Sequence, residues 1–165
     1  MSILIRKAER EDFPKLLDLI TALAHYEKLN PPDEGAQQRL IEHAWGDRPR
    51  YEPWLVEVDG IPAAYAILFE TYSSFLAQPT LYLEDIFVLP EYRKRGVGQA
   101  VFKRLAQEAA ARECGRMEWS CLDWNELALG FYKKLGARQL SEWVYFRLTS
   151  DEIAALANSG TPTAK

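Results

Sequence analysis

The chain has 165 residues, of which 48% are hydrophobic and 27% are charged, and its formal net charge at neutral pH is −4. This length fits one domain with a sizeable core, and the composition is that of a globular protein rather than a disordered one. The mild acidic balance argues against a general nucleic-acid binder, which needs a net basic face. The apolar runs are far shorter than the roughly 20 residues of a membrane span, so we also expect no membrane partner.

The N-terminal sequence MSILIRKAERED becomes charged too early for the hydrophobic region of a secretory signal, which predicts a cytoplasmic protein. The two cysteines and two histidines are scattered, without the spacing of a disulfide framework or a zinc site. We therefore expect no metal. Cys114 and Cys121 have no evident histidine partner and are expected to be buried structural residues.

The first third of the chain predicts a strand followed by two helices. Ile3–Lys7 alternates apolar and charged residues, as a strand does. From Asp12 to Lys28 the apolar residues recur at i, i+3, i+4 and i+7, which indicates a helix with one buried face. Pro31 and Pro32 end this helix, and a weaker helix is predicted over Glu34–Trp45.

A hairpin follows, because Asp59-Gly60 is a strong turn signal between the apolar strands Trp54–Val58 and Ile61–Thr71. We expect an irregular aromatic connection at Tyr72–Gln78 and then another strand over Leu81–Val88. The remaining predicted elements are a helix that begins near Val97 and ends before Gly115, a strand Arg116–Leu122, a helix Asn125–Leu135 with Gly136 after its end, a strand Trp143–Leu148, and a helical turn at Asp151–Ala157.

This order of elements predicts an α/β or α+β three-layer domain, with a mixed sheet and helices on both of its faces. No internal repeat or linker divides the sequence. We expect one domain over residues 1–150. Residues 151–165 should then hold a short helical turn and a disordered tail, NSGTPTAK.

A basic, glycine-bearing loop joins the strand Leu81–Val88 to the next helix. Arg93, Lys94 and Arg95 come just before Gly96 and Gly98, where the helix begins. A helix start exposes unpaired N–H groups and positive dipole charge, and glycine lets a phosphate approach the backbone. The loop therefore predicts a phosphate-bearing ligand. A P-loop is excluded because Gln99-Ala100 follow Gly98, and a Rossmann fingerprint because Val101 stands where a third Gly or Ala is needed.

The remaining pattern, Arg-x-x-Gly-x-Gly at residues 93–98, resembles the acetyl-CoA pyrophosphate loop of the GCN5-related N-acetyltransferase (GNAT) superfamily. A second segment resembles this superfamily too, with Asn125 followed at the correct spacing by Tyr132, Gly136 and Ala137. The resemblance extends from about Ile3 to Leu148. It implies a GNAT-type fold with a mostly antiparallel sheet, and acetyl-CoA as co-substrate.

Three short stretches narrow the resemblance to the spermidine/spermine (diamine) N-acetyltransferases and their thialysine-acetylating relatives. They are Ala24–Glu27, Leu81–Asp85 and Leu122–Asn125. One departure stands out, because Thr71-Tyr72 is followed by Ser73-Ser74-Phe75, where polyamine-specific members carry Asp-Pro-Trp. An acidic contact for a long polyamine is thus missing, which favours the thialysine branch.

The resemblance also implies roles for individual residues. Glu84 is expected to act as general base through a water, and Tyr132 as general acid toward the departing thiolate. The amine substrate is expected to contact Tyr26, Glu27, Glu84 and Asp85. The residues expected to bind acetyl-CoA are Ile86, Phe87, Val88, Arg93, Lys94, Arg95, Gly96, Val97, Gly98, Gln99, Asn125, Glu126, Leu127, Ala128 and Tyr132. A main-chain N–H of Phe87 or Val88 would hold the thioester oxygen.

Glu84 and Asp85 are adjacent, so in a regular strand they would face opposite sides, and a β-bulge would let both approach the substrate. The expected function is acetyl-CoA-dependent transfer of an acetyl group to a small primary amine (a diamine, or a lysine-like or thialysine-like amine) without a covalent enzyme intermediate. The alternatives are a protein or peptide acetyltransferase and a non-catalytic CoA-binding module. A homodimer is expected, paired through the aromatic segment Trp143–Leu148, as in relatives.

Overall fold

The computed structural model describes residues 1–160, and its chain forms two compact units, Met1–Asn125 and Glu126–Lys165. The first unit holds a five-stranded sheet in the order β1-β2-β3-β4-β5. Neighbouring strands are antiparallel except for β4 and β5, which are parallel. The mixed, mostly antiparallel sheet is as predicted. The strands are β1 Ile3–Lys7, β2 Glu52–Val58, β3 Ile61–Ser73, β4 Gln78–Val88 and β5 Arg116–Trp119.

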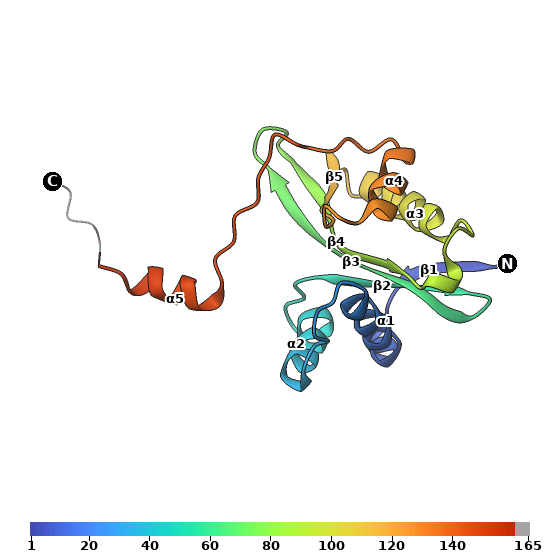
Figure 1. Ribbon diagram of the computed structural model, residues 1–165, viewed down its shortest axis with the longest axis horizontal. Helices are drawn as coiled ribbons and strands as arrows, with labels where there is room; N and C mark the ends of the chain where they lie inside the picture. The colour runs from blue at the N-terminus through green and yellow to red at the C-terminus, as the bar shows by residue number, and fades with distance from the viewer. Residues whose placement is uncertain (161–165) are drawn as a thin grey trace. The chain divides into compact units, whose positions relative to one another are not determined.

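Helices cover both faces of this sheet, which confirms the three-layer prediction (Figure 1). The helices α1, Phe13–Tyr26, and α2, Glu34–Trp45, lie on one face, and α3, Val97–Ala111, lies on the other. Short 3₁₀ turns precede α1 and follow β4, at η1 Arg10–Asp12 and η2 Pro90–Tyr92. Among the described residues, no helix is both long and apolar enough to cross a membrane.

The two faces of the sheet have separate cores. On one face Leu16 and Leu19 of α1 pack with Leu55, Tyr65 and Phe87 of three successive strands. On the other, α3 buries an apolar ridge, and its Arg104 guanidinium lies 4.9 Å from the centre of the Trp54 ring. Fully burying a large apolar side chain contributes about 1.5–3 kcal/mol, so these cores hold the layers together.

The pairing of β3 with β4 is irregular at the acidic dipeptide. Asp85 lies opposite Ile67 and Leu83 lies opposite Leu68, which leaves Glu84 without a partner on β3. One extra residue on one strand is a β-bulge, and the expected bulge is thereby confirmed. Because cross-strand partners share a face, Asp85 lies on the α1 side of the sheet, whereas Leu83 lies on the α3 side.

Both ends of α1 are fixed by local interactions. Before its start, the Arg6 guanidinium donates to both carboxylate oxygens of Asp12, at 2.6 and 3.0 Å, which lowers the pKa of Asp12 to about 2. At its end, Lys28 adopts a left-handed φ of 60° and the N–H of Leu29 donates to the carbonyl of Ala24 at 2.8 Å. The helix therefore ends at Tyr26, slightly before the predicted end at Lys28.

Two segments of the first unit differ from the sequence expectation. The connection predicted at Tyr72–Gln78 is shorter, since Tyr72 pairs with Pro79 and Ser73 with Gln78, which leaves residues 74–77 as the turn. Side chains that suit a pleated surface extend the hairpin farther than the composition of the segment suggested. The strand predicted over Arg116–Leu122 is shorter, because β5 ends at Trp119.

The second unit contains α4, Glu126–Lys134, and α5, Ser150–Asn158. Gly136 has a left-handed φ of 84°, and its N–H donates to the carbonyl of Lys133 at 3.0 Å, which confirms its place after the end of the helix. The helical turn predicted at Asp151–Ala157 is confirmed by α5. Of the predicted disordered tail, residues 161–165 lie outside the described residues.

The strand predicted at Trp143–Leu148 is wrong. These residues form no strand, and their aromatic side chains are exposed, with 91% of the Phe146 surface accessible. A strand needs a partner for its backbone N–H and C=O groups, and within residues 1–160 no strand pairs with this segment. Its high strand propensity alone is not enough.

Candidate active site

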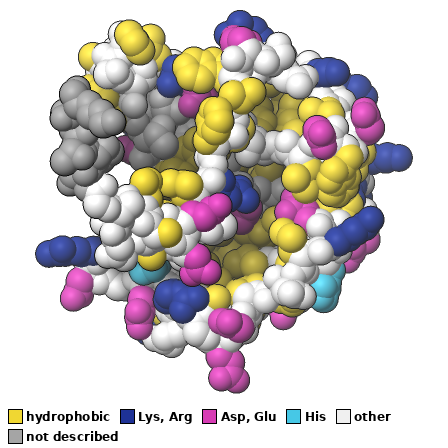
Figure 2. Space-filling model, turned by 60° about the vertical axis from the view of Figure 1, so that its left-hand side comes forward, with side chains coloured by type: hydrophobic (Ala, Val, Ile, Leu, Met, Phe, Trp, Pro, Cys, Tyr) yellow, Lys and Arg dark blue, Asp and Glu magenta, His cyan; other side chains and the backbone are white. Residues whose placement is uncertain are grey.

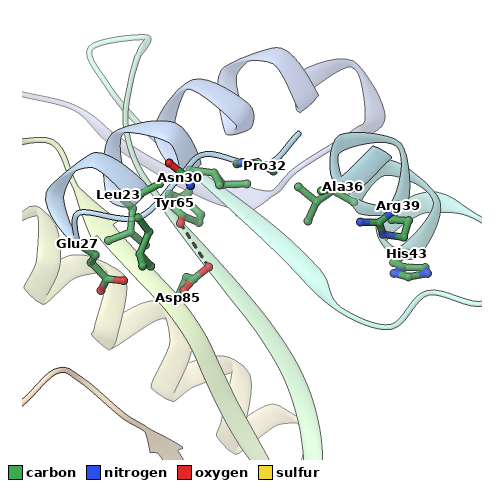
Figure 3. Close-up of a pocket in the computed structure, with 13 residues that line it drawn as sticks. Leu23, Glu27, Asn30, Pro32, Ala36, Arg39, His43, Tyr65 and Asp85 are labelled. Atoms are coloured by element: carbon green, nitrogen blue, oxygen red, sulfur yellow. Dashed lines mark hydrogen bonds between the residues drawn. The ribbon is translucent and has the colours of Figure 1, made fainter. Parts of the chain in front are cut away.

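A cavity of about 490 Å³ lies on the α1 side of the sheet (Figure 3). Its walls come from α1, from the connection between α1 and α2, and from one face of α2. Two sheet residues, Tyr65 of β3 and Asp85 of β4, complete it. Its size is in the range of small-molecule sites, and all its lining residues belong to the first unit.

One end of this pocket is acidic. Glu27, at the end of α1, and Asp85 both line it, and the Tyr65 hydroxyl donates to Oδ2 of Asp85 at 3.4 Å. Burial, together with the negative charges of Glu84 and Glu27, raises the pKa of Asp85 to about 6, and the Tyr65 hydrogen bond opposes this rise. Glu84 and Glu27 therefore both lie close enough to repel the charge of Asp85, and such a site favours a cation.

The bulge gives the two adjacent carboxylates different surroundings. Asp85 is partly buried and lines the pocket, whereas Glu84 is exposed and does not line it. Glu84 still lies near enough to raise the pKa of Asp85 by its charge. The structure thus brings Glu27, Glu84 and Asp85 to one neighbourhood.

An aromatic cluster stands beside the acidic end. The Tyr26 ring lies 6.0 Å from that of Phe87 and 6.1 Å from that of Trp124, and its hydroxyl donates to Oδ1 of Asn125 at 3.4 Å. The Arg93 guanidinium carbon lies 5.0 Å from the Tyr26 ring and 5.3 Å from the Phe87 ring. These contacts hold the end of α1 against the end of β4 and the start of the glycine loop.

Past the bulge, one edge of β4 is open. In the described chain β5 pairs only with Thr80–Leu83, so residues 85–88 have no strand on that side. The N–H of Leu89 donates to the carbonyl of Ala63 on β3 at 2.9 Å, and alternation along an antiparallel strand then turns the backbone groups of Val88 away from β3. The Val88 carbonyl indeed accepts from Nε of Arg93 at 2.8 Å. Of the two candidate amides, that of Val88 rather than Phe87 points to the open edge.

The glycine loop has the geometry of an anion site at a helix start. Gly96 is the N-cap of α3 with a left-handed φ of 82°, and Lys94 also has a positive φ, of 57°. The first intrahelical bond runs from the N–H of Ala100 to the carbonyl of Gly96, so the amides of residues 97–99 lie ahead of it. The side chains of Lys94 and Arg95 are exposed, whereas Val97 is buried and anchors the turn.

The other predicted cofactor residues lie in the second unit. Glu126, Leu127, Ala128 and Tyr132 belong to α4, and the Tyr132 ring lies 5.6 Å from that of Phe131. Asn125 directly precedes this helix. No motif marks three further pocket residues, Tyr65, Arg39 and His43; only their positions on β3 and α2 bring them to the cavity.

The remaining reactive side chains show no second centre. Cys114 and Cys121 are partly rather than fully buried, and burial raises the pKa of each thiol. Within residues 1–160, no group of three or more His, Cys, Asp or Glu side chains is arranged to hold a metal ion. On the face shown in Figure 2, Lys and Arg side chains are mixed with Asp and Glu side chains and do not form one continuous basic surface.

Residues 5–137 match the family model described as the acetyltransferase (GNAT) family. The chain belongs to the GNAT family of acetyltransferases. This match includes both the bulged strand with Glu84 and Asp85 and the glycine loop. The family assignment made from residues 93–98 and 125–137 is confirmed.

Among curated relatives, the GNAT chain is 34% identical to a thialysine N-epsilon-acetyltransferase of Sus scrofa over 167 residues, which covers 94% of this chain and 98% of the relative. It is 37% identical to an L-ornithine N5-acetyltransferase of Arabidopsis thaliana over 110 residues, covering 67% and 48% of the two chains. Among solved structures, an integron cassette protein from the mobile metagenome of V. cholerae has a TM-score of 0.81 at 22% identity, covering 96% of this chain and 99% of that one. That likeness shows the fold.

Proposed function

We propose that this GNAT enzyme transfers an acetyl group from acetyl-CoA directly to a small primary amine, of the diamine, lysine-like or thialysine-like class. The observation that carries this proposal is the acidic end of the pocket, where Glu27 and Asp85 line a cavity of about 490 Å³. A cavity of this size fits a small molecule, and its carboxylates suit an ammonium group. The thialysine and ornithine activities named for two relatives support the same substrate class.

The residues present fit acetyl-CoA. The amides of residues 97–99 and the exposed Lys94 and Arg95 suit its pyrophosphate, since a helix start with free N–H groups attracts an anion. The open edge of β4, at Ile86–Val88, offers backbone groups to the pantetheine, and Val88 N–H suits the thioester oxygen. Asn125 and the first residues of α4 remain proposed as contacts of acetyl-CoA. When bound, acetyl-CoA supplies an activated acetyl group, and CoA leaves as a thiol.

The acceptor amine must lose a proton before it attacks, because an alkylammonium has a pKa near ~10.4. Glu84 on the bulge remains our proposed proton acceptor, acting through a water. Asp85 is a second candidate, favoured by its place in the pocket and by its raised pKa of about 6, because a base works best near the operating pH. In either case the proton passes from the amine nitrogen to a carboxylate oxygen at this dipeptide.

Tyr132 is proposed as the general acid, because a phenol is protonated at neutral pH and can donate its proton to the thiolate sulfur. Tyr132→Phe should lower kcat by about tenfold to a hundredfold while the KM for acetyl-CoA stays within about twofold. Phe131→Leu, a neighbouring change on α4, is the control for packing. An unchanged kcat for Tyr132→Phe would remove the residue from the mechanism.

The overall proposal is tested by following the release of CoA thiol from acetyl-CoA with a panel of diamines, lysine analogues and peptides. We expect turnover with at least one small amine. Glu84→Gln and Asp85→Asn should each lower kcat/KM for it by about a hundredfold or more. Turnover with peptides alone would favour the protein acetyltransferase alternative. Tight binding of acetyl-CoA without turnover of any acceptor would favour a CoA-binding module.

We also propose a homodimer in the cytoplasm. The exposed side chains of Trp143, Tyr145 and Phe146 support self-association, since contiguous exposed apolar side chains commonly mark interfaces. Sedimentation at micromolar concentration should give twice the monomer mass, and a monomer alone would contradict it. The family match crosses the boundary at residue 125, which supports one acetyltransferase domain over residues 1–150.

A further inference from the structure

The end of the pocket away from the carboxylates is basic. Ala36, Arg39, Leu40 and His43 recur at i, i+3, i+4 and i+7 and present one face of α2 to the cavity. In Figure 3 Arg39 and His43 lie on one side, and Glu27 and Asp85 lie on the other. The pocket therefore has two ends of opposite chemical character.

The guanidinium of Arg39 is available to a ligand. In the described part of the chain, Arg6 and Arg112 are held in ion pairs with acidic side chains, whereas Arg39 is exposed and has no carboxylate partner. His43 is partly buried beside it, one helical turn farther along α2. A planar guanidinium presents paired N–H donors that match the two oxygens of a carboxylate.

The two ends are also separate from each other. The charges that act on Asp85 are those of Glu84 and Glu27, and neither Arg39 nor His43 is among the groups that shift its pKa. The pocket is also lined by apolar side chains, among them Ile20, Leu23 and Leu40. An acidic end, a basic end and an apolar lining fit a methylene chain with an ammonium at one terminus and a carboxylate at the other.

We propose that Arg39, assisted by His43, binds the carboxylate of an ω-amino acid acceptor, whose side-chain ammonium lies at Glu27 and Asp85. This inference rests on the proposed function and narrows it, from amines in general to amino acids of the ornithine, lysine and thialysine type. Arg39 would then make the enzyme prefer these amino acids over diamines, which lack a carboxylate.

The test compares each amino acid with its decarboxylated partner: ornithine with putrescine, lysine with cadaverine, and thialysine with its thioether diamine. For the wild-type enzyme, we expect kcat/KM to be at least tenfold higher for the best amino acid than for its diamine. Arg39→Gln should raise the KM for the amino acid about tenfold or more and leave that for the diamine within twofold. Arg39→Lys should raise the KM for the amino acid less than Arg39→Gln does, because lysine keeps the positive charge but lacks the paired N–H donors of the guanidinium.

Two further variants complete the design. His43→Gln should raise the KM for the amino acid by a smaller factor, again without effect on the diamine. Arg48→Gln removes an exposed arginine just after α2 that does not line the pocket, and it should change neither substrate. The proposal is overturned if the diamines are the better substrates, or if Arg39→Gln affects both classes equally.

A failure of the proposed function gives a different result, namely no CoA release with any amine. The carboxylate site is then tested by calorimetry on the same proteins. Binding of ornithine, lysine or thialysine that Arg39→Gln weakens about tenfold would support the site. The absence of binding, or binding indifferent to Arg39, would overturn it.

Discussion

Tyr65 and Asp85 meet across β3 and β4, where the Tyr65 hydroxyl lies 3.4 Å from Oδ2 of Asp85. Asp85 is opposite Ile67 and Tyr65 is opposite Phe87, so the pair is diagonal on the face that carries α1. The surroundings hold the pKa of this carboxyl at about 6, because they remove it from water and place two other carboxylates nearby. The enzyme thus keeps an acid beside its pocket that is costly to ionise.

Asp85→Asn should make the folded protein more stable at pH 7–8 while it lowers activity. The folded-state pKa of Asp85 is raised from 3.8 to about 6, so ionisation above pH 6 costs the folded state about 3 kcal/mol at most. Below pH 4 the carboxyl is protonated in both states and the cost vanishes. Urea unfolding at pH 8, 6 and 4 should show the gain of the variant shrinking in that order.

Glu84→Gln is the matched control for this stability measurement. Glu84 is exposed, and its charge is only one of the causes that raise the pKa of Asp85, so Glu84→Gln should stabilise the folded protein at pH 8 by less than Asp85→Asn does. If Asp85→Asn were no more stable than Glu84→Gln at pH 8, the ionisation cost assigned to Asp85 would be wrong.

Tyr65→Phe should shift the acid limb of the pH profile upward. The Tyr65 hydrogen bond stabilises the charged form of Asp85 and lowers its pKa, so its loss raises that pKa above about 6. Activity that needs ionised Asp85 should then decline at a higher pH than in the wild type. The measurement is kcat/KM from pH 5 to 8, with Tyr72→Phe, an exposed tyrosine of β3, as the control. Coincident profiles for all three proteins would show that the hydrogen bond has no functional effect.

Gly96→Ala should impair both stability and the use of acetyl-CoA, whereas Gly60→Ala should impair stability alone. Both glycines have a left-handed φ, of 82° and 80°, and at both positions an added Cβ would meet open space. The penalty is therefore the backbone strain of about 1–2 kcal/mol in each variant. Because Gly96 caps α3 in the proposed pyrophosphate loop, only its variant should raise the KM for acetyl-CoA, by about tenfold. An equal KM in the two variants would argue against this loop as the cofactor site.

Arg93→Lys separates a structural role from direct contact with a phosphate. The Arg93 side chain donates to the Val88 carbonyl and lies over the rings of Tyr26 and Phe87. Lysine keeps the charge but not the planar guanidinium, so we expect a loss of stability of about 1–2 kcal/mol and weaker binding of the acceptor amine. Thermal unfolding and the two KM values measure this. A variant with wild-type stability would show that charge alone is needed at this position.

Elements whose formation depends on nearby residues could be predicted from the sequence, whereas elements that need a distant partner could not. The hairpin at Asp59-Gly60, the helix Glu34–Trp45 and the loop at Gly96 rest on local turn and capping chemistry, and all three form as predicted. The segment 143–148 was mispredicted because strand formation depends on a partner elsewhere in the protein, which local propensity does not supply.

The acidic residues of the site were found because they lie in family-like stretches, but the rest of the pocket was not. Tyr65 reads as one apolar strand residue among several, and Arg39 and His43 read as the polar side of a weak helix. Their common cavity arises only when α2 packs on the same face as α1, so their role depends on tertiary structure.

The bulge at Glu84 changes which side chains of β4 face each side of the sheet. Leu83 and Asp85 are two residues apart, yet Leu83 faces α3 and Asp85 lines the pocket on the α1 side, because the extra residue resets the alternation between them. An insertion or deletion of one residue between Asp85 and Phe87 would again exchange the two faces of the strand and turn Phe87 out of its core. The number of residues between Asp85 and Phe87 should therefore be fixed.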